Sequence, residues 1–207
     1  MGVVQIIHGI SEHIGRYDHF ARYLNSLGYL VVAEDHMGHG KTASSGVVGY
    51  FHGGWFAVAE DSYRLYKDTR KAHPHIPYFL FGHSMGSFLL RTIMIEHPEC
   101  EASGCIICGT GWIPTPVLKT GIAACKAVCA VADETKPSPF LQSIVFGSYN
   151  KKIEHPRTPF DWLSRDNAVV DAFISDPMCG FTASAGLLRD MMVGISYIQR
   201  EENLARM

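Results

Sequence analysis

Ser84 stands between two glycines, Gly82 and Gly86, in the segment GHSMG. The apolar run Tyr78–Phe81 leads into it, and an apolar segment with helical spacing follows. A G-x-S-x-G sequence between a buried strand and a helix is typical of a sharp turn that lifts the serine hydroxyl above a sheet. Glycine is expected at both flanking positions because a side chain there would collide with neighbouring backbone. Nucleophilic attack is therefore the predicted chemistry of Ser84, and a glycine-rich turn with an incidental serine is the alternative.

A nucleophilic serine needs backbone donors where negative charge develops on the substrate oxygen. The helix after Ser84 would direct the amide of Met85 and its positive dipole end toward that point. The stretch HGISEHIGRY, which follows the first apolar run, supplies a second candidate. Gly9 allows the backbone to turn so that the N–H of Ile10 faces Ser84. The predicted oxyanion hole consists of the backbone amides of Ile10 and Met85, with an ordinary strand-to-helix turn as the alternative.

Other sequences that could carry chemistry are less convincing. Gly40-Lys41-Thr42 resembles the end of a phosphate-binding loop, but that motif needs glycine where Asp35 stands. Cys105 and Cys108 have the spacing of a metal or redox pair, yet in a strand this spacing places them on opposite faces. We therefore expect core cysteines, no bound nucleotide, no metal and no cofactor.

The bulk composition limits the classes of partner. The 207 residues carry a formal charge of −2 and are 47% hydrophobic, which fits one globular domain with a sizeable core. No run of Lys or Arg could follow a phosphate backbone, so no nucleic-acid partner is expected. The first residues lack a basic segment followed by a long apolar one, so we expect no signal peptide and a cytoplasmic protein.

The elements that must position Ser84 follow from apolar periodicity. Four short apolar runs indicate strands buried on both faces, and helical patterns centred on Phe20–Leu27, Ala59–Tyr66 and Ser84–His97 lie among them. Strands that alternate with helices predict an α/β fold, a parallel sheet with helices on both faces. The predicted strands are Val3–Ile7, Tyr29–Ala33, Tyr78–Phe81 and Gly104–Cys108.

The pattern changes after Cys108. Residues 110–190 contain seven prolines among amphipathic helical pieces, of which Thr115–Ala132 and Phe160–Ser175 are the clearest. This length exceeds an ordinary connection between strands and predicts a helical insertion over one end of the sheet. We expect a core at residues 1–109, a helical cap at 110–182, and a returning part at 183–207 whose helix runs from Ala183 to about Leu204.

The motifs HGISEHIGRY, DHMGHGKT, GHSMG and FDWLSRDNAVVDAFISDPMCGF together resemble the monoacylglycerol lipase and lysophospholipase-like branch of the α/β-hydrolase superfamily, also labelled serine aminopeptidase S33 or hydrolase-4. The resemblance covers nearly the whole chain. It implies a serine hydrolase of carboxylic esters, often of lipids, with a helical cap. By that resemblance Ser84 is the nucleophile, and Ile10 and Met85 give the oxyanion amides.

The chain also departs from this family. There the catalytic acid and then the histidine follow the serine in sequence, in turns after later strands. Only His97 and His155 follow Ser84 here. His97 would lie about 20 Å away along the helix, and His155 is expected at the surface. His83 is adjacent to Ser84, but neighbouring side chains on a tight turn diverge. The expectation is a partial α/β-hydrolase fold whose catalytic Asp and His are not in this chain and whose activity is lost.

An apolar stripe hints at the substrate. Apolar residues recur on two predicted helices, and methionines suit an adaptable site for an acyl chain. We expect a lipophilic ester, with a small soluble ester or an amide as alternatives, and an apolar cap allows peripheral contact with a membrane. A binding module that keeps the pocket without catalysis is the alternative of another class. The residues of the stripe are Val117, Leu118, Ile122, Val128, Val131, Met191, Met192, Val193 and Ile195.

Overall fold

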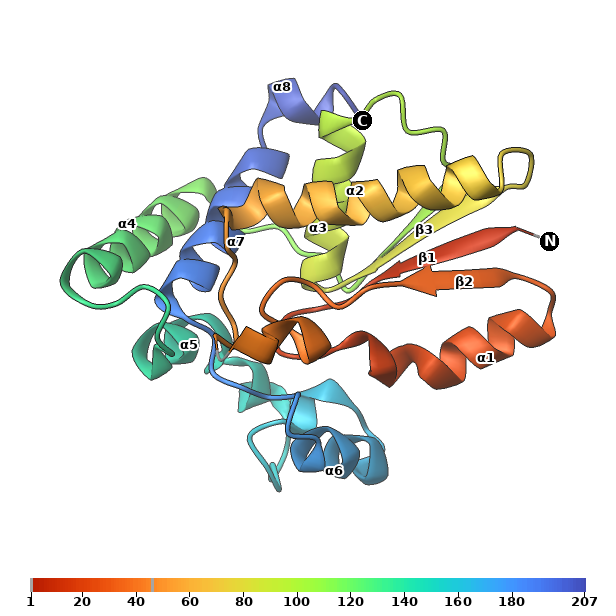
Figure 1. Cartoon of the computed structure of the whole chain (residues 1–207). Helices are drawn as coiled ribbons and strands as arrows, with labels where there is room; N and C mark the ends of the chain where they lie inside the picture. Colours follow the sequence, from red (N-terminus) through yellow and green to blue (C-terminus); the bar gives the residue numbers. More distant parts are fainter. Residues whose placement is uncertain (1, 46) are drawn as a thin grey trace.

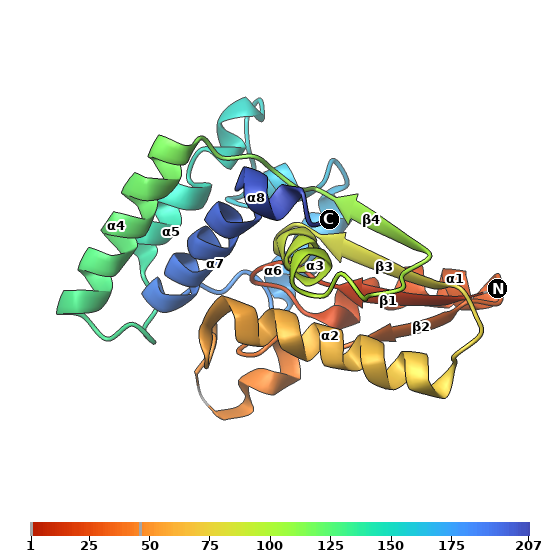
Figure 2. The ribbon, with the colours of Figure 1, turned by 90° about the horizontal axis from the view of Figure 1, so that it is seen from above.

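A four-stranded parallel sheet forms the centre of the computed structural model, which describes residues 2–45 and 47–207. Its strands are β1 (Val3–Ile7), β2 (Leu30–Ala33), β3 (Tyr78–His83) and β4 (Gly104–Cys108), in the order β2-β1-β3-β4. Because all four strands are parallel, their carboxyl ends meet at one edge of the sheet. Figure 1 and Figure 2 show the later helices gathered beyond that edge. The predicted α/β class is confirmed.

Helices cover both faces of the sheet, as β3 shows by its alternation. Tyr78 and Leu80 are buried on the side of α2 (Gly54–Ala72) and α3 (Met85–Glu96). Phe81 on the other side meets Phe20 of α1 (Asp18–Ser26) with ring centroids 5.5 Å apart. Figure 1 shows α1 and α2 on opposite sides of the strands.

Strand β1 is buried along its whole length, but the edge strands β2 and β4 are not. Every residue of β1 is buried, whereas Ile106 of β4 is 50% exposed and Ile107 is 37% exposed. The prediction that all four strands are buried on both faces is therefore wrong for β2 and β4, and in β3 buried residues alternate with partly exposed ones. Only an inner strand has a neighbouring strand on both sides and a helix on both faces, and β2 and β4 are at the edges.

The later helices are α4 (Thr115–Val131), α5 (Pro139–Phe146), α6 (Asn167–Ser175), α7 (Ala185–Ile198) and α8 (Glu201–Leu204). Two predicted boundaries are wrong. The helix expected over Phe160–Ser175 is confined to α6, because the Asp166 side chain accepts a hydrogen bond from the Ala168 amide and starts a new helix. The final helix is broken at Gln199 and Arg200, between α7 and α8.

Helix α7 joins the later helices to the core. Its Gly194 lies against the Trp55 indole of α2, and that indole donates a 2.9 Å hydrogen bond to the Thr92 hydroxyl of α3. A Cβ added at Gly194 would approach the indole to 2.1 Å. The close crossing of α7, α2 and α3 therefore depends on the absence of a side chain at position 194.

Short 3₁₀ helices complete the chain, and none of the helices in the described ranges has both the length and the apolar character needed to cross a bilayer. The 3₁₀ segments are Ile14–Tyr17, Gly40–Ser45, Tyr149–Lys152 and Asp161–Leu163.

The Gly194→Ala substitution tests this crossing. We expect it to destabilise the fold by about 1–3 kcal/mol, because the indole is rigid and hydrogen-bonded and cannot move aside cheaply. The measurement is the free energy of unfolding from urea denaturation followed by circular dichroism.

Gly121→Ala in α4 is the matched control. Its Cβ would approach the flexible Met192 thioether at 2.6 Å, which can move, so we expect a change within about 1 kcal/mol. Equal losses in the two variants would contradict the role assigned to the Trp55 contact.

Candidate active site

Ser84 occupies a strained turn between β3 and α3. Its backbone has φ 54° and ψ −120°, a region that non-glycine residues rarely adopt. The turn is held on both sides: the Ser84 amide donates to the Cys108 carbonyl at 2.9 Å, and the Ser84 carbonyl accepts from the Ser87 amide at 2.9 Å. The predicted location of Ser84, after a strand and before a helix, is therefore observed.

The glycines at 82 and 86 are required by close backbone contacts. A Cβ at Gly86 would lie 2.0 Å from the Ile7 carbonyl oxygen of β1, and one at Gly82 would lie 2.5 Å from the Gly86 carbonyl oxygen. Both contacts are with backbone, which cannot move aside as a flexible side chain can. Strand β1 and helix α3 thus pack against each other directly beneath the turn.

The loop after β1 lies beside Ser84. A Cβ added at Gly9 would be 3.2 Å from the Ser84 Cβ, and Gly9, Ile10 and Ser84 line the same cavity. The Gly9 amide is already used, since it donates to the Glu12 carboxylate at 2.6 Å. Within residues 2–45 and 47–207, the amides of Ile10 and Met85 donate no hydrogen bond to a protein group. Both amides are available to a ligand at Ser84.

A cavity of about 780 Å³ opens at the carboxyl ends of β1 and β3. Its inner end carries polar side chains, including Glu12, Arg16 and His83. Its outer wall comes from residues 139–182. The apolar side chains of that wall are Pro139, Phe146, Tyr149, Pro159, Phe160, Trp162, Leu163 and Phe173.

The apolar stripe predicted to cover the pocket lies elsewhere, so that prediction is wrong. No residue of α4 or α7 is among the described residues that line the cavity. Leu118 and Cys125 of α4 are instead buried in the same core cluster as Met191 and Ile195 of α7, and the two helices pack against each other through their apolar faces. The periodicity of apolar residues in the sequence cannot tell a face that packs on another helix from a face that lines a pocket.

A polar cluster around Glu12, missed by the sequence analysis, forms the inner end of the cavity. The Glu12 carboxylate accepts hydrogen bonds from the Gly9 amide and the Tyr17 hydroxyl (2.8 Å), and it pairs with Arg16. His83 Nδ1 lies 2.9 Å from that hydroxyl and 3.4 Å from Glu12. Burial alone would raise the pKa of Glu12, but the His83 hydrogen bond, the Arg16 charge and the other donors lower it to about 2.

The same contacts assign a role to His83. With the Tyr17 hydroxyl directed to Glu12, His83 must donate through Nδ1, which leaves its Nε2 as an acceptor near Gly109. These bonds tie His83 to the Glu12 cluster, and its side chain makes no hydrogen bond to Ser84. Glu12 lies in the loop just before the 3₁₀ helix Ile14–Tyr17, and its spacing of four residues from Arg16 is the sequence signal for this ion pair.

Three buried histidines lie behind the loop that carries Ile10. The rings of His8 and His36 have centroids 4.0 Å apart, and His39 lies 5.4 Å from His8. Burial lowers the pKa of all three, to about 3 for His36 and about 4 for His39. Among the described residues, His36 Nδ1 and His39 Nε2 are buried without a partner. All three histidines are neutral near pH 7.

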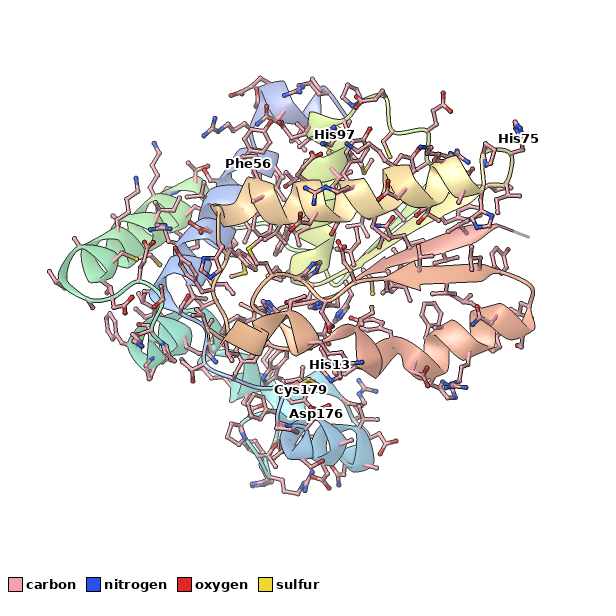
Figure 3. All side chains as sticks on the ribbon, viewed as in Figure 1. His13, Phe56, His75, His97, Asp176 and Cys179 are labelled. Carbon is pink, nitrogen blue, oxygen red and sulfur yellow. The ribbon has the colours of Figure 1, made fainter. Side chains whose placement is uncertain are left out.

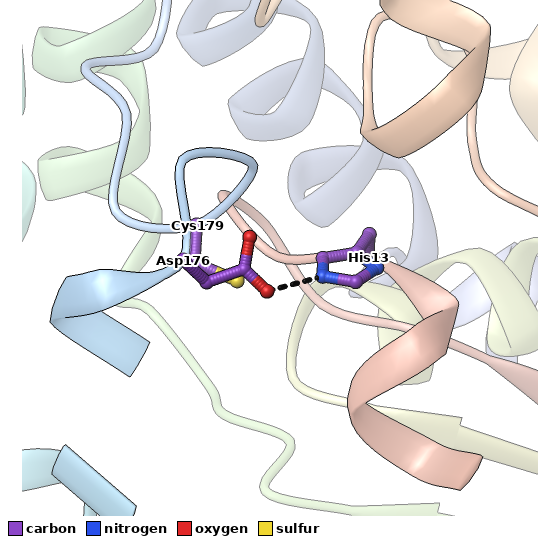
Figure 4. A group of neighbouring side chains, drawn as sticks. All are labelled: His13, Asp176 and Cys179. Atoms are coloured by element: carbon purple, nitrogen blue, oxygen red, sulfur yellow. Dashed lines mark hydrogen bonds and ion pairs between the residues drawn. The ribbon is translucent and has the colours of Figure 1, made fainter. Parts of the chain in front are cut away.

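A second contact joins the loop that carries Ile10 to the segment after α6, and it consists of His13, Asp176 and Cys179 (Figure 3, Figure 4). His13 Nε2 donates to the Asp176 carboxylate at 2.8 Å, because its Nδ1 accepts from the Gly15 amide at 3.1 Å. That hydrogen bond lowers the pKa of Asp176, while burial raises the pKa of Cys179 to about 12. A metal ion on Nε2 would require the proton to move to Nδ1, opposite the Gly15 N–H. The group therefore fits a structural contact better than a metal site.

Other predicted positions can be placed directly. His97 lies at the end of α3 away from Ser84 and bonds to Glu60 (Figure 3). His155 is exposed. Cys105 and Cys108 pair with Leu80 and His83 of β3, on opposite faces of the sheet. The site brings together the Ser84 hydroxyl and the free amides of Ile10 and Met85, and no side chain among the described residues hydrogen-bonds that hydroxyl.

Comparison with known proteins decides the family. The family model described as Hydrolase_4, serine aminopeptidase, S33, matches residues 1–207. The chain belongs to the serine aminopeptidase S33 family.

Two relatives illustrate the similarity within this S33 family. The chain is 30% identical over 177 residues to a monoacylglycerol lipase of Mycolicibacterium smegmatis, covering 86% of this chain and 56% of that protein. It is 29% identical over 179 residues to the human monoglyceride lipase, covering 85% and 52%. The chain therefore spans about half the length of these relatives.

Solved structures of an esterase and a lipase are also similar to this chain. A carboxyl esterase from Bacillus coagulans, in complex with glycerol, has a TM-score of 0.89 and 33% identity, covering 99% of this chain and 67% of that one. A lipase in its open form has a TM-score of 0.87 and 29% identity, covering 100% and 68%. The sheet and the helices above it thus have the arrangement of the α/β-hydrolase fold.

The histidine cluster predicts acid lability. The histidines have depressed pKa values when folded but ordinary ones near 6.5 when unfolded, so the unfolded chain binds more protons below pH 6.5. Their stabilising effect is complete above that pH and is lost as the pH falls toward about 4. We expect His36 and His39 each to lower the free energy of unfolding by about 2 kcal/mol at pH 5 relative to pH 7, measured by urea unfolding at the two pH values.

His39→Phe removes one of these groups and should reduce the loss between pH 7 and pH 5 by about a third. His19→Gln, an exposed position on α1, should leave the loss unchanged. A free energy of unfolding that is flat between pH 7 and pH 5 would contradict the neutral, buried state assigned to the cluster.

Proposed function

We propose that this chain carries the nucleophile and oxyanion hole of a carboxylic ester hydrolase, with Ser84 as the nucleophile. The observation that supports it is the strained Ser84 turn, whose side chain opens into a cavity beside two amides without internal partners. Strain at a turn is retained where the surrounding structure and a function require it. The named activities of the relatives, monoacylglycerol lipase and carboxyl esterase, agree with this chemistry.

The reaction follows from the geometry. The Ser84 oxygen attacks the ester carbonyl carbon while its proton passes to a base, and the amides of Ile10 and Met85 stabilise the resulting oxyanion. Return of the proton to the alcohol oxygen releases the alcohol and leaves an acyl group on Ser84. Water, deprotonated by the same base, then attacks the acyl carbonyl and releases the carboxylic acid.

The remaining requirement is a general base to accept the Ser84 proton, and none hydrogen-bonds the Ser84 hydroxyl in the described part of the chain. No histidine among the described residues contacts the Ser84 hydroxyl, and the chain spans about half the length of its relatives. We propose that the histidine base and its acid partner come from polypeptide other than these 207 residues. Catalysis by this chain alone would then depend on the oxyanion hole and on binding.

The two ends of the cavity suggest the substrate. The apolar side chains of residues 139–182 suit an acyl chain, and the polar cluster at Glu12 and Arg16 suits hydroxyl groups. The ionised Glu12, with its pKa near 2, opposes a phosphate on the leaving group. A monoacylglycerol fits this arrangement better than a lysophospholipid. The glycerol in the similar Bacillus coagulans esterase is consistent with this.

Peripheral membrane contact is part of the same proposal. Several apolar side chains on α4 and α5 face solvent, where they could meet a lipid surface and bring it near the cavity wall. These exposed side chains are Val117 (58%), Val131 (87%), Phe140 (64%) and Ile144 (55%).

Labelling with a fluorophosphonate tests the nucleophile. We expect slow labelling of the chain alone and a large increase when free imidazole is added as an external base, because the cavity is open to small molecules. Ser84→Ala should abolish labelling, and Ser143→Ala, a serine that lines the same cavity, should not. The measurement is the rate of probe incorporation into folded protein.

Labelling that survives Ser84→Ala would overturn the assignment of the nucleophile. Rapid labelling without imidazole would instead show that a base lies within the chain. His83 would then be the candidate, and His83→Gln would have to remove the fast reaction.

Ligand binding to a chain that lacks the Ser84 hydroxyl tests the acyl site. Together with the labelling experiment, it distinguishes a hydrolase from a module that only binds. Of the three tryptophans, Trp162 lines the cavity, Trp55 is buried and Trp112 is exposed. In the Ser84→Ala chain, we expect a monoacylglycerol to change tryptophan fluorescence through Trp162. Trp162→Phe should remove most of this signal, and Trp112→Phe should retain it.

A signal carried by Trp112 would place the ligand outside the cavity and contradict the proposed acyl site. Binding together with no labelling of Ser84, even with imidazole, would favour the binding module over the hydrolase.

A further inference from the structure

The Ile10 amide can serve as an oxyanion donor only if its N–H points toward Ser84. That direction is fixed by the Gly9–Ile10 peptide, whose carbonyl and N–H lie in one plane and point in opposite directions. The Gly9 carbonyl oxygen lies 2.8 Å from His8 Nδ1. The other face of the same peptide borders the cavity that Ile10 and Ser84 line.

The protonation of His8 follows from its neighbour. The backbone N–H of His36 donates to His8 Nε2 at 3.0 Å, so Nε2 must be the acceptor and Nδ1 must carry the proton. The His36 ring bonds back to the His8 carbonyl, also at 3.0 Å. His8 is 0% exposed and His36 is 2% exposed, so water cannot replace these bonds.

We infer that His8 is a positioning residue for the oxyanion hole, which it sets through the Gly9 carbonyl. The chain of contacts runs from the His36 N–H to His8 Nε2, then from His8 Nδ1–H to the Gly9 carbonyl. Holding that oxygen among the buried histidines turns the N–H of Ile10 toward the cavity. This inference rests on the proposed function, since a donor needs aiming only if an oxyanion forms at Ser84.

Glu12 fixes the orientation of the preceding peptide, His8–Gly9, in the same loop. By accepting the Gly9 N–H at 2.6 Å it removes that amide as a competing donor. The amides on either side of Gly9 therefore have different roles: one is bound to Glu12, and the other is left for the ligand. The titratable groups around His8 are His36 and His39 from the loop after β2 and Glu12 and His13 from its own loop.

Two substitutions at His8 separate positioning from packing. In His8→Asn the side-chain amide nitrogen can take the place of Nδ1 and keep the donor to Gly9. In His8→Gln the side-chain amide reaches the place of Nε2, keeping a partner for the His36 N–H but losing the Gly9 donor. Both variants lose the ring packing on His36, so they should be destabilised to a similar degree.

The first readout does not depend on catalysis. In the wild-type chain, nitrogen NMR of His8 should show a protonated Nδ1 and an unprotonated Nε2. The dipolar coupling of the Ile10 N–H should be unchanged in His8→Asn and altered in His8→Gln. The opposite tautomer, or the same Ile10 coupling in both variants, would overturn the inference.

The second readout is the rate of fluorophosphonate labelling of Ser84 with imidazole present, per folded molecule. We expect His8→Gln to be slower than His8→Asn by about tenfold to a hundredfold, because a misdirected oxyanion donor is lost. Equal rates would overturn the inference. If the wild-type chain is not labelled at all, the proposed function fails, and the NMR result still decides whether His8 orients the Gly9–Ile10 peptide.

Discussion

The packing of α3 on β1 beneath Ser84 is the contact on which the site depends. The Ile7 carbonyl approaches Gly86 so closely that a methyl group there would lie 2.0 Å from its oxygen. This contact forces the sharp turn, gives Ser84 its positive φ and brings the start of α3 to the carboxyl end of β1. The loop of Gly9 and Ile10, which continues from β1, is thereby set beside Ser84. One backbone contact thus positions both the serine and the donor opposite it.

Buried polar groups make that loop rigid. On the cavity side of the loop, Glu12 accepts from the Gly9 amide and the Tyr17 hydroxyl and pairs with Arg16. On the side of the buried histidines, His8 bonds to the Gly9 carbonyl. Such groups are stable in the interior only when they are hydrogen-bonded, so each one constrains the backbone it binds. The cost is sensitivity to acid, because both the histidines and Glu12 lose stabilising interactions when they are protonated.

Much of the scaffold could be predicted from the sequence, because its signals are local. The limits of β1 and β4 were predicted to the residue, and the Ser84 turn followed from two glycines at fixed spacing. The cavity wall could not be predicted, since α4 and residues 139–182 are both apolar and only the tertiary structure shows which faces the site. The contacts of Glu12 and His8 could not be predicted from the sequence for a similar reason. Their partners, such as His83 and His36, are distant in sequence, so no local pattern joins them.

The most direct test of the central claim, that Ser84 is a nucleophile served by a preformed oxyanion hole, is to map where an ester acylates the folded chain. The chain would be incubated with 4-nitrophenyl decanoate and imidazole, then analysed by intact mass and peptide mapping. The account predicts one decanoyl group per chain, on Ser84, with one equivalent of nitrophenol released in a burst. Acylation at other residues, or none in a sample shown to be folded, would contradict it.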